Sequence, residues 1–306
     1  MLSFSITHQD HCRRLESYLR TLMPKSPFGY ARKLIKNGAA RCNGAIVTPD
    51  TLLTYHDMVT LKESGATTGY ITRSRPFLDI LYEDGLITIV NKPPGLPMHR
   101  TAECEENLVD VGQVYMIQRE TPCKLYPVNR LDRGTSGAVI LAKSSSSAGI
   151  YGRQVKETGL DKLYLALVWG TPEECGIITE PLDKKESETR YRSTVTGENC
   201  TLLAVSPISG RMHQIRRHLA AIGHSVIGDK RYDGGDMPEL SGFALHSFKT
   251  SLTLSEAGIL NVYAPVPDEL LHLCELRGIG RDMLLEIVTR LTKLNHLQPC
   301  RLETTR

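Results

Sequence analysis

Aromatic residues are scarce in this chain of 306 residues: they make up 6% of it, and there is a single Trp. A nucleic-acid partner would therefore have to be bound mainly through Arg, Lys and backbone groups. No run of about 18 apolar residues occurs, which argues against a membrane-spanning helix and a membrane partner. The first twenty residues lack the apolar core of a signal peptide and contain acidic residues. We therefore expect a cytoplasmic protein.

Closely spaced cysteines are also missing. The eight cysteines lie far apart, with no CxxC and no pair at the spacing of a metal site. This pattern favours reduced thiols over a disulfide framework, and it gives no reason to expect a metal ion.

The charge of the chain is concentrated at one end. The length suits about two domains, and 41% hydrophobic with 23% charged residues is typical of a globular protein. Residues 1–63 contain nine Lys or Arg against five Asp or Glu, although the net charge of the whole chain is only +3. This excess predicts a small accessory unit that binds a polyanion. The alternative is a basic, solvated face without a partner.

Residues 1–63 have the pattern of a compact small domain. Apolar residues at helical spacing predict helices over 12–20 and 28–37, and Asn43-Gly44 predicts a hairpin turn between short strands. The candidate polyanion-binding side chains surround the second helix: Arg32, Lys33, Lys36 and Arg41. Residues 64–77 follow as a predicted linker.

The chain becomes rich in predicted strands from residue 78 to residue 266. Apolar runs predict strands within 80–92, 136–144, 162–170 and 200–210, and helices are expected over 105–118, 145–157 and 212–222. Many strands with scattered helices predict an α+β domain on a mixed, mostly antiparallel β-sheet. The remaining residues, 267–306, form a predicted helical extension in which Leu284, Ile287, Leu291 and Leu294 share one face.

Asp132 is the first candidate for chemistry. It lies between Arg130 and Arg133, directly before Gly134. Cationic neighbours keep a carboxylate ionised, which suits a nucleophile better than a general acid. The alternative is a surface Arg–Asp–Arg turn of little energetic importance.

A second candidate is the basic start of the predicted helix near residue 212. This end is crowded by Arg211, His213, Arg216 and Arg217. The apolar spacing of the helix places Arg216 near its buried side. An arginine in that position needs a carboxylate or a phosphate as partner. His213, His218 and His224 lack the carboxylate or cysteine spacing of a metal site, so we interpret them as hydrogen-bonding or RNA-contacting groups.

Tyr164 is the third candidate. In a strand over 162–170 it shares a face with Ala166 and Val168. A strand tyrosine most often belongs to the core. Its functional interpretation is a ring that stacks on a planar substrate, with a hydroxyl available for proton transfer.

The order of these segments resembles that of the RluA-type pseudouridine synthases over about residues 78–266. The first 63 residues resemble an S4 RNA-binding domain. The similar segments are NKPPG at 91–95, RLDRGTSG at 130–137, KLYLALV at 162–168, GRMHQIRRH and its continuation at 210–235, and FALHS at 243–247. Asn129 departs from the family, which usually has histidine there, and this puts target choice or loop geometry in question.

The resemblance implies a reaction and roles for the candidate residues. Such enzymes break the N1–C1′ bond of a uridine in RNA, turn the uracil and form a C5–C1′ bond, with no redox change and no cofactor. Asp132 would be the catalytic carboxylate, Tyr164 would stack on the base and Arg216 would pair with Asp132 and fill the space left by the base. The implied substrate contacts are Arg130, Arg133, Arg211, His213 and Leu245.

The resemblance also implies an RNA partner. We favour large-subunit ribosomal RNA over transfer RNA as substrate, and we expect a monomer. One alternative is an inactive S4-containing RNA-binding or ribosome-assembly factor. Another is a carboxylate-dependent hydrolase, which would need a second carboxylate beside Asp132, with Asp229 as the candidate; we interpret Asp229 as structural.

Overall fold

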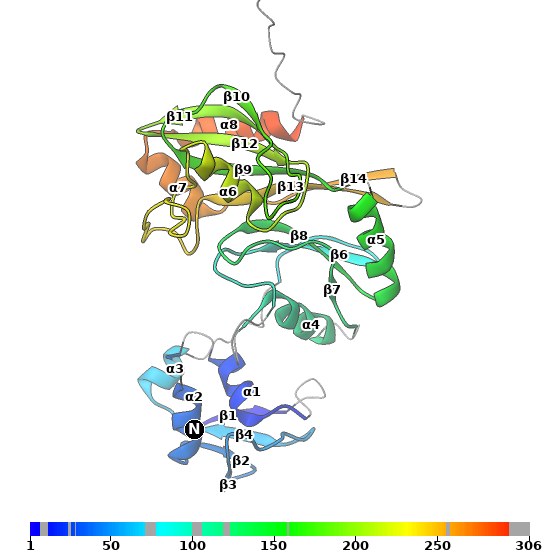
Figure 1. Cartoon of the computed structure of the whole chain (residues 1–306). Helices are drawn as coiled ribbons and strands as arrows, with labels where there is room; N and C mark the ends of the chain where they lie inside the picture. The colour runs from blue at the N-terminus through cyan, green and yellow to red at the C-terminus, as the bar shows by residue number, and fades with distance from the viewer. Residues whose placement is uncertain are drawn as a thin grey trace, which may run out of the picture. The chain divides into compact units, whose positions relative to one another are not determined.

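The computed structural model describes residues 1–6, 12–23, 26–27, 29–70, 78–99, 106–118, 123–157, 159–254 and 258–293. It divides into two compact units. The first comprises Met1–Phe77, Ala102–Cys104 and Gln113–Pro122, and the second comprises Leu78–Thr101, Glu105–Gly112 and Cys123–Arg306. The mixed α+β character expected from the sequence is confirmed (Figure 1).

The first unit is a small sheet covered by two helices. Its sheet has the order β1-β4-β2-β3 and is antiparallel. Its core includes Leu15 and Leu19 of α1, Ile35 of α2 and Val59 and Leu61 of β4. The elements are β1 (Leu2–Ser5), α1 (Leu15–Leu22), α2 (Tyr30–Lys36), β2 (Ala40–Cys42), β3 (Ala45–Ile46), β4 (Met58–Leu61) and α3 (Gly65–Tyr70). The hairpin at Asn43-Gly44 is present as predicted.

Helix α3 lies in the segment predicted to be a linker. Ser64 accepts a hydrogen bond from the backbone N–H of Thr67 at 3.1 Å, which satisfies a free donor at the start of this helix. Thr67 is buried and its hydroxyl contacts that of Tyr30 at 3.0 Å. Residues 64–70 are therefore structured, and 71–77 lie outside the described residues.

The second unit is built on a sheet of ten strands within the part of the chain that the structure describes. The order is β10-β11-β12-β9-β13-β8-β6-β5, with β14 paired to β13 and β7 to β8. The strands are β5 (Ile80–Glu83), β6 (Ile87–Lys92), β7 (Tyr126–Pro127), β8 (Ser136–Ala142), β9 (Asp161–Trp169), β10 (Cys175–Ile178), β11 (Thr189–Gly197), β12 (Cys200–Pro207), β13 (Leu245–Leu254) and β14 (Gly258–Tyr263). The helices are α5 (Ser145–Glu157), α6 (Gln214–Ala221), α7 (Asp268–Leu276) and α8 (Arg281–Thr292), while α4 (Leu108–Gln118) is divided between the two units.

The seam between β8 and β13 joins the two sides of this sheet. It is parallel and has two residue pairs, His246 with Ser136 and Ser247 with Gly137. A Cβ atom on Gly137 would overlap the carbonyl oxygen of Ser247, so glycine is required for this close approach. His246 adds side-chain bonds, because Nδ1 lies 2.9 Å from the Ser136 hydroxyl and Nε2 lies 3.2 Å from the Ala264 carbonyl.

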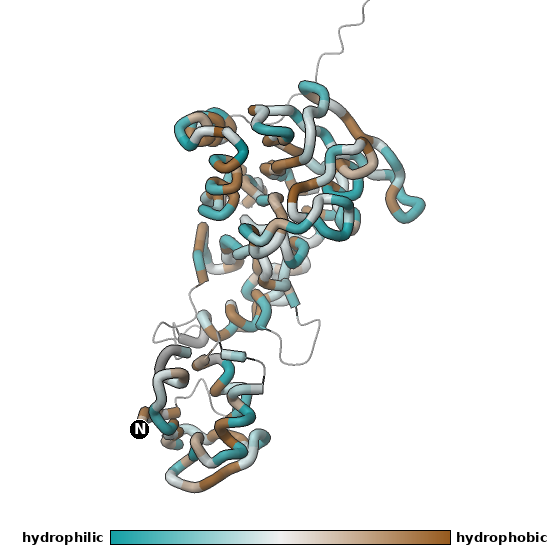
Figure 2. Tube along the Cα trace, turned by 90° about the vertical axis from the view of Figure 1, so that its left-hand side faces the viewer, coloured by the Kyte–Doolittle hydropathy of each residue, from teal (hydrophilic) through white to brown (hydrophobic). Residues whose placement is uncertain are grey.

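Helices cover the sheet through their apolar faces. Brown and teal positions alternate along the helical coils in Figure 2, which is the pattern of amphipathic helices. Tyr151 of α5 packs in one core with Ile89 of β6 and Ile140 of β8. In the predicted extension, α8 buries Leu284, Ile287 and Leu291, whereas Leu294 lies outside the described residues. No helix in the described ranges is long and apolar enough to span a bilayer.

One observation differs from the expectation of reduced thiols. Cys12, Cys42, Cys123, Cys200 and Cys274 are free, but Cys175 is disulfide-bonded. The absence of closely spaced cysteines did not exclude a bond between distant positions.

Candidate active site

Asp132 lies in the loop between β7 and β8, where the backbone turns sharply. The N–H of Thr135 donates to the Asp132 carbonyl at 3.1 Å, which closes the turn. The Asp132 side chain remains 28% exposed, so its carboxylate is accessible from solvent. Arg130 and Arg133 on the same loop are exposed.

Arg216 of α6 connects Asp132 to a second carboxylate. Its Nη1 donates to Asp132 Oδ2 at 2.8 Å, while Nε and Nη2 donate to the two oxygens of Asp229 at 2.6 and 2.8 Å. Burial alone would lower the pKa of Arg216, but the hydrogen bonds to Asp229 and Asp132 raise it above its usual value. The buried guanidinium is therefore charged and fixed by a bidentate contact.

Two aromatic rings flank this guanidinium. Arg216 Cζ lies 4.3 Å from the centroid of the Phe243 ring and 5.0 Å from that of Tyr232. Such contacts stabilise a desolvated cation by about 2 kcal/mol. The ring of Phe243 also lies against Gly134, where a Cβ atom would approach it to 2.5 Å. The glycine of the loop thus permits the packing that brings Asp132 next to Arg216.

His213 lies beside Asp132 at the start of α6. Its backbone is left-handed, with φ of 54°. Nδ1 is 2.9 Å from the hydroxyl of Tyr232, and Nε2 is 3.9 Å from Asp132 Oδ1. Burial lowers the pKa of His213, and the nearby Arg216 lowers it further against the opposing effect of Asp132. The imidazole is therefore mainly neutral at pH 7.

Tyr164 of β9 is buried and lies opposite Ser247 of β13 in the antiparallel register. Burial raises the pKa of Tyr164 to about 12, and the charge of Asp132 acts in the same direction, while a hydrogen bond with Ser247 opposes it. Its hydroxyl is therefore protonated at neutral pH.

Lys92 is a functional candidate that the sequence analysis missed. It is fully buried at the end of β6, and Nζ donates to the carbonyls of Pro93, Leu96 and Arg133 at 2.9, 2.8 and 3.0 Å. The contact with Arg133 ties this amine to the residue after Asp132. Burial lowers the pKa of Lys92 to about 7, although the charge of Asp132 raises it. A lysine that interrupts an apolar strand just before two prolines was the available signal.

The structure brings together only some of the predicted site residues. Asp132, His213 and Arg216 form one connected group. Tyr164 lies opposite Ser247, which itself pairs with Gly137 directly after the Asp132 loop. Leu245 is buried at the first position of β13, opposite Ala166. Outside this group, the Arg211 Nε donates to the Glu186 carbonyl at 3.1 Å.

Asn129 has a structural contact in the position where histidine was expected. It is buried, and its Oδ1 accepts a hydrogen bond from the backbone N–H of Ile140 at 2.8 Å. Asn129 therefore attaches the start of the Asp132 loop to β8.

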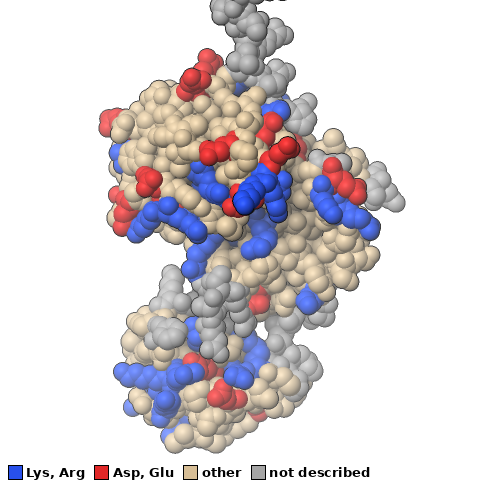
Figure 3. Space-filling view, viewed as in Figure 1, with Lys and Arg blue, Asp and Glu red and all other residues tan. Residues whose placement is uncertain are grey.

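Two of the four basic residues predicted to bind RNA make contacts within the first unit. Arg32 pairs with Glu16 at 2.8 Å. Arg41 donates to the carbonyls of Gly38 and Gly44 at 3.3 and 3.4 Å, which closes the β2–β3 hairpin. The side chains of Lys33 and Lys36 are exposed. Figure 3 shows Lys and Arg side chains on the displayed face of this unit.

The histidines interpreted as hydrogen-bonding or RNA-contacting groups make hydrogen bonds within the protein. His218 is buried, with Nδ1 2.9 Å from the Thr189 hydroxyl and Nε2 3.0 Å from the Glu180 carbonyl. His224 Nδ1 lies 2.8 Å from the Trp169 carbonyl. Among the described residues no group of three His, Cys, Asp or Glu side chains could hold a metal ion.

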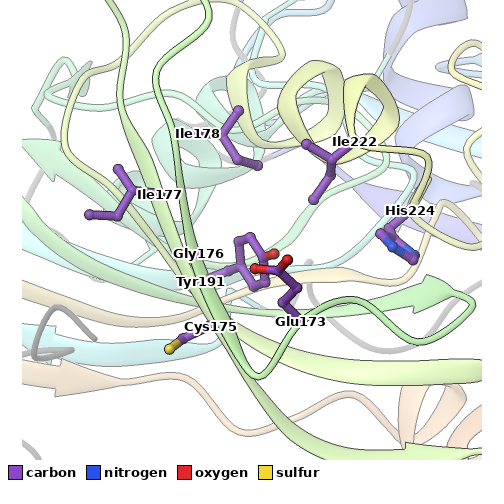
Figure 4. A pocket seen from close by; sticks show the side chains of 8 residues that line it. All are labelled: Glu173, Cys175, Gly176, Ile177, Ile178, Tyr191, Ile222 and His224. Carbon is purple, nitrogen blue, oxygen red and sulfur yellow. The ribbon is translucent and has the colours of Figure 1, made fainter. Parts of the chain in front are cut away.

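A separate cavity of about 530 Å³ lies between the end of α6 and the strands β10 and β11. Figure 4 shows the side chains that line it: Glu173, Cys175, Ile177, Ile178, Tyr191, Ile222 and His224, together with Gly176. It contains none of the residues of the Asp132 group.

Comparison with known proteins identifies the class to which this fold and site belong. A family model described as RNA pseudouridylate synthase matches residues 87–221, which include Asp132, Tyr164 and Arg216. The chain is 30% identical over 254 residues to the ribosomal large subunit pseudouridine synthase C of Haemophilus ducreyi, covering 75% of this chain and 78% of that protein. The chain belongs to the RluA-type RNA pseudouridylate synthase family and is an isomerase.

Further relatives agree with this assignment. The ribosomal large subunit pseudouridine synthase C of Escherichia coli K12 is 28% identical over 304 residues, covering 88% of this chain and 94% of that protein. The solved structure of human RNA pseudouridylate synthase domain containing 4 has a TM-score of 0.55 and 21% identity, covering 64% of this chain and 92% of that one. The similarity to this solved structure supports a pseudouridine synthase fold over the part of the chain that it covers.

Proposed function

We propose that this enzyme converts a uridine of large-subunit ribosomal RNA to pseudouridine and that Asp132 is its catalytic carboxylate. The observation that carries the assignment is the ion pair of Asp132 with the buried, charged Arg216. A carboxylate that is paired with a buried cation and 28% exposed suits attack on an electron-poor carbon or stabilisation of a cationic sugar. Relatives matched over 78% and 94% of their own length are named ribosomal large subunit pseudouridine synthase C, which supports that substrate.

The reaction moves one bond and exchanges one proton. The N1–C1′ bond breaks, the uracil turns and a C5–C1′ bond forms, while C5 loses its proton and N1 gains one. Asp132 would capture or stabilise the detached sugar. The target base must first leave its stack, at a cost of a few kcal/mol, and the exposed Arg130 and Arg133 would offset this cost through phosphate contacts.

We assign Tyr164 a stacking role against the uracil. Its pKa of about 12 keeps the phenol neutral, and removal of the C5 proton by the phenolate would require that pKa to fall when RNA binds. The buried Leu245 would pack against the same base, and the neutral His213 beside Asp132 would contact the nucleotide as a hydrogen-bonding group.

We further propose that residues 1–63 form an S4-like RNA-binding domain. Two helices on a small sheet and the exposed Lys33 and Lys36 support this assignment. Phosphate contacts from such a domain would add affinity with little sequence information. We place the enzyme in the cytoplasm, acting as a monomer, where its ribosomal substrate is assembled.

The test is tritium release from RNA labelled at uridine C5. Ribosomal and transfer RNA from cells lacking this protein would be incubated with the wild type, with Asp132→Asn and with Asp183→Asn. Asp183 is the matched control, because its carboxylate pairs with Arg217 at 3.0 Å and is 57% exposed. We expect release from ribosomal RNA by the wild type and the control only.

Other outcomes would overturn particular parts of the proposal. Release from transfer RNA alone would refute the substrate, and release by Asp132→Asn would refute the catalytic carboxylate. Salt-sensitive binding without release from either RNA would favour the inactive RNA-binding factor.

A further inference from the structure

Tyr232 is a residue of the candidate active site to which the proposed function gives no role. Its hydroxyl lies 2.9 Å from Nδ1 of His213, and the two rings meet edge to face with their centroids 5.8 Å apart. Arg216 Cζ lies 5.0 Å from the centroid of the same tyrosine ring. Both residues that Tyr232 contacts approach Asp132, His213 to 3.9 Å and Arg216 to 2.8 Å.

Tyr232 belongs to a closed turn that also contains Asp229. The carbonyl of Asp229 accepts hydrogen bonds from the N–H groups of Tyr232 and Gly234, at 3.1 and 2.8 Å. A Cβ atom on Gly234 would overlap a backbone carbonyl oxygen, so the turn requires glycine at this position. One turn therefore presents the carboxylate of Asp229 to Arg216 and the hydroxyl of Tyr232 to His213.

The surroundings of His213 favour one tautomer of its imidazole. Nε2 lies 3.9 Å from Asp132 Oδ1, and the negative carboxylate favours a proton on the nitrogen that faces it. Nδ1 then accepts a hydrogen bond from the hydroxyl of Tyr232 at 2.9 Å. Because 3.9 Å is too long for a hydrogen bond, Asp132 does not occupy the Nε2–H donor. The site thus holds an N–H donor beside the candidate catalytic carboxylate.

Cleavage of the N1–C1′ bond creates a need for such a donor. The electron pair of this bond stays with the uracil, so negative charge develops on N1 and spreads to the carbonyl oxygens. A fixed N–H donor that faces this charge stabilises the transition state. Burial lowers the pKa of His213, so the ring donates as a neutral group and does not form an ion pair with Asp132.

We propose that His213 donates its Nε2–H to the uracil as the N1–C1′ bond breaks, and that Tyr232 is the positioning residue that fixes this tautomer and its direction. The histidine keeps its proton throughout. When the C5–C1′ bond forms, C5 releases its proton to water and N1 takes one from water. This inference rests on the proposed function, since it requires a uridine to be cleaved next to Asp132.

The experiment compares two RNA probes that differ by one atom at the target base. Both are fragments around the uridine mapped by tritium release, and the second has 5-fluorouridine at that position. The fluorine withdraws electrons and stabilises the uracil anion, so a hydrogen-bond donor matters less for its departure. Single-turnover loss of the N1-linked nucleoside would be followed by chromatography of the digested RNA, because 5-fluorouridine has no C5 proton to release.

The variants separate the donor from the residue that positions it. His213→Ala removes the donor, whereas His213→Asn tolerates the left-handed backbone and retains an N–H group. Tyr232→Phe removes only the hydroxyl and keeps the ring beside Arg216. Tyr82→Phe is the matched control, because the hydroxyl of Tyr82 donates to a carboxylate on another part of the sheet at 3.0 Å.

We expect His213→Ala to slow conversion of uridine by about 100-fold and conversion of 5-fluorouridine by no more than about tenfold. His213→Asn should recover part of the lost rate. Tyr232→Phe should slow conversion of uridine by about tenfold, with less than about a twofold change in the RNA concentration that half-saturates the enzyme, because it misaligns the donor without removing it. Tyr82→Phe should retain both rates.

Two outcomes would overturn the inference while the proposed function holds. An equal loss of rate on both probes for His213→Ala would show that the imidazole does not stabilise the departing base. A wild-type rate of Tyr232→Phe on uridine would show that its hydroxyl does not position the donor. Conversion of the uridine probe by the wild type supports the proposed function in either case, and a wild type that converts neither probe would overturn both.

Discussion

Asp132 and Arg216 are 84 residues apart in the chain, and their side chains meet at 2.8 Å. The other two nitrogens of the same guanidinium, Nε and Nη2, are held by the bidentate contact with Asp229. Asp229 thus acts through Arg216 and does not touch Asp132 in any contact of the described residues. We therefore predict that Asp229, interpreted from the sequence as structural, positions Arg216 for its contact with Asp132.

Asp229→Asn should lower kcat by about 10–100-fold with little change in KM. The neutral amide cannot hold both guanidinium nitrogens, so Arg216 would shift relative to Asp132, and a displacement of about 1 Å at a catalytic group can cost about 100-fold. The measurement is pseudouridine formation under saturating and subsaturating RNA.

The exposed carboxylate of Asp183 provides the control for this change. Asp183→Asn removes the partner of Arg217 at the surface and should leave kcat unchanged, because exposed pairs contribute about 0–1 kcal/mol. Full activity of Asp229→Asn would show that Arg216 does not depend on this carboxylate.

Because of Lys92, the free energy of unfolding should increase as the pH rises above 7. The unfolded chain holds the proton of Lys92 up to its usual pKa of 10.5, whereas the folded protein releases it near pH 7. The unfolded state therefore binds more protons in this window, and stability rises with pH. The free energy of unfolding of the wild type, minus that of Lys92→Met, should increase by roughly 2 kcal/mol from pH 7 to pH 9.

Urea titration followed by the fluorescence of Trp169 measures this difference. Trp169 is the single Trp of the chain and belongs to β9, so its signal reports on the second unit. Lys230→Met removes a lysine that is 68% exposed and should show no such dependence. A constant difference between wild type and Lys92→Met across this range would contradict the lowered pKa.

Neutralising Arg32, Lys33 and Lys36 together should weaken RNA binding and flatten its salt dependence. Loss of three phosphate contacts reduces the slope of log affinity against log salt by about 2. Arg32 should contribute less than the two lysines because it pairs with Glu16. Filter binding at several salt concentrations gives the slope, and an unchanged slope would remove residues 1–63 from the RNA interface.

Glu16→Gln tests the same surface by making it more positive instead of less. The change removes a negative charge beside Arg32, so RNA binding should become tighter and steeper in its dependence on salt. If neither the neutralised basic residues nor Glu16→Gln changes the RNA affinity or its salt dependence, the main phosphate contacts lie in the second unit.

The sequence predicted those strands whose own residues form an apolar run. The apolar runs of β8 and β9 were found because both strands are buried along nearly their whole length. Strand β11 was missed because its sequence TRYRSTVTG is polar and half-exposed. Helix α7 lies inside the predicted helical extension over 267–306, but its bounds were not predicted, since its short apolar stretch follows two prolines.

Long-range contacts of the site could not be deduced from local patterns. The spacing of α6 indicated that Arg216 lies near its buried side and needs an anion, and the structure supplies two. Nothing in the sequence near Phe243 indicates that its ring covers that guanidinium. The contact of Lys92 with the Arg133 carbonyl spans 41 residues and arises only when β6 and β8 are paired.

The two-residue seam between β8 and β13 is a short backbone connection between the two sides of the ten-stranded sheet. Asp132 precedes β8 on one side of the seam, while Tyr164 and Arg216 belong to elements on the other side. A nucleotide held between them would cross-link the two sides of the sheet at their narrowest backbone connection. A nucleotide bound in this way would stabilise the second unit against separation of its two sides, because it binds only the form in which they are joined.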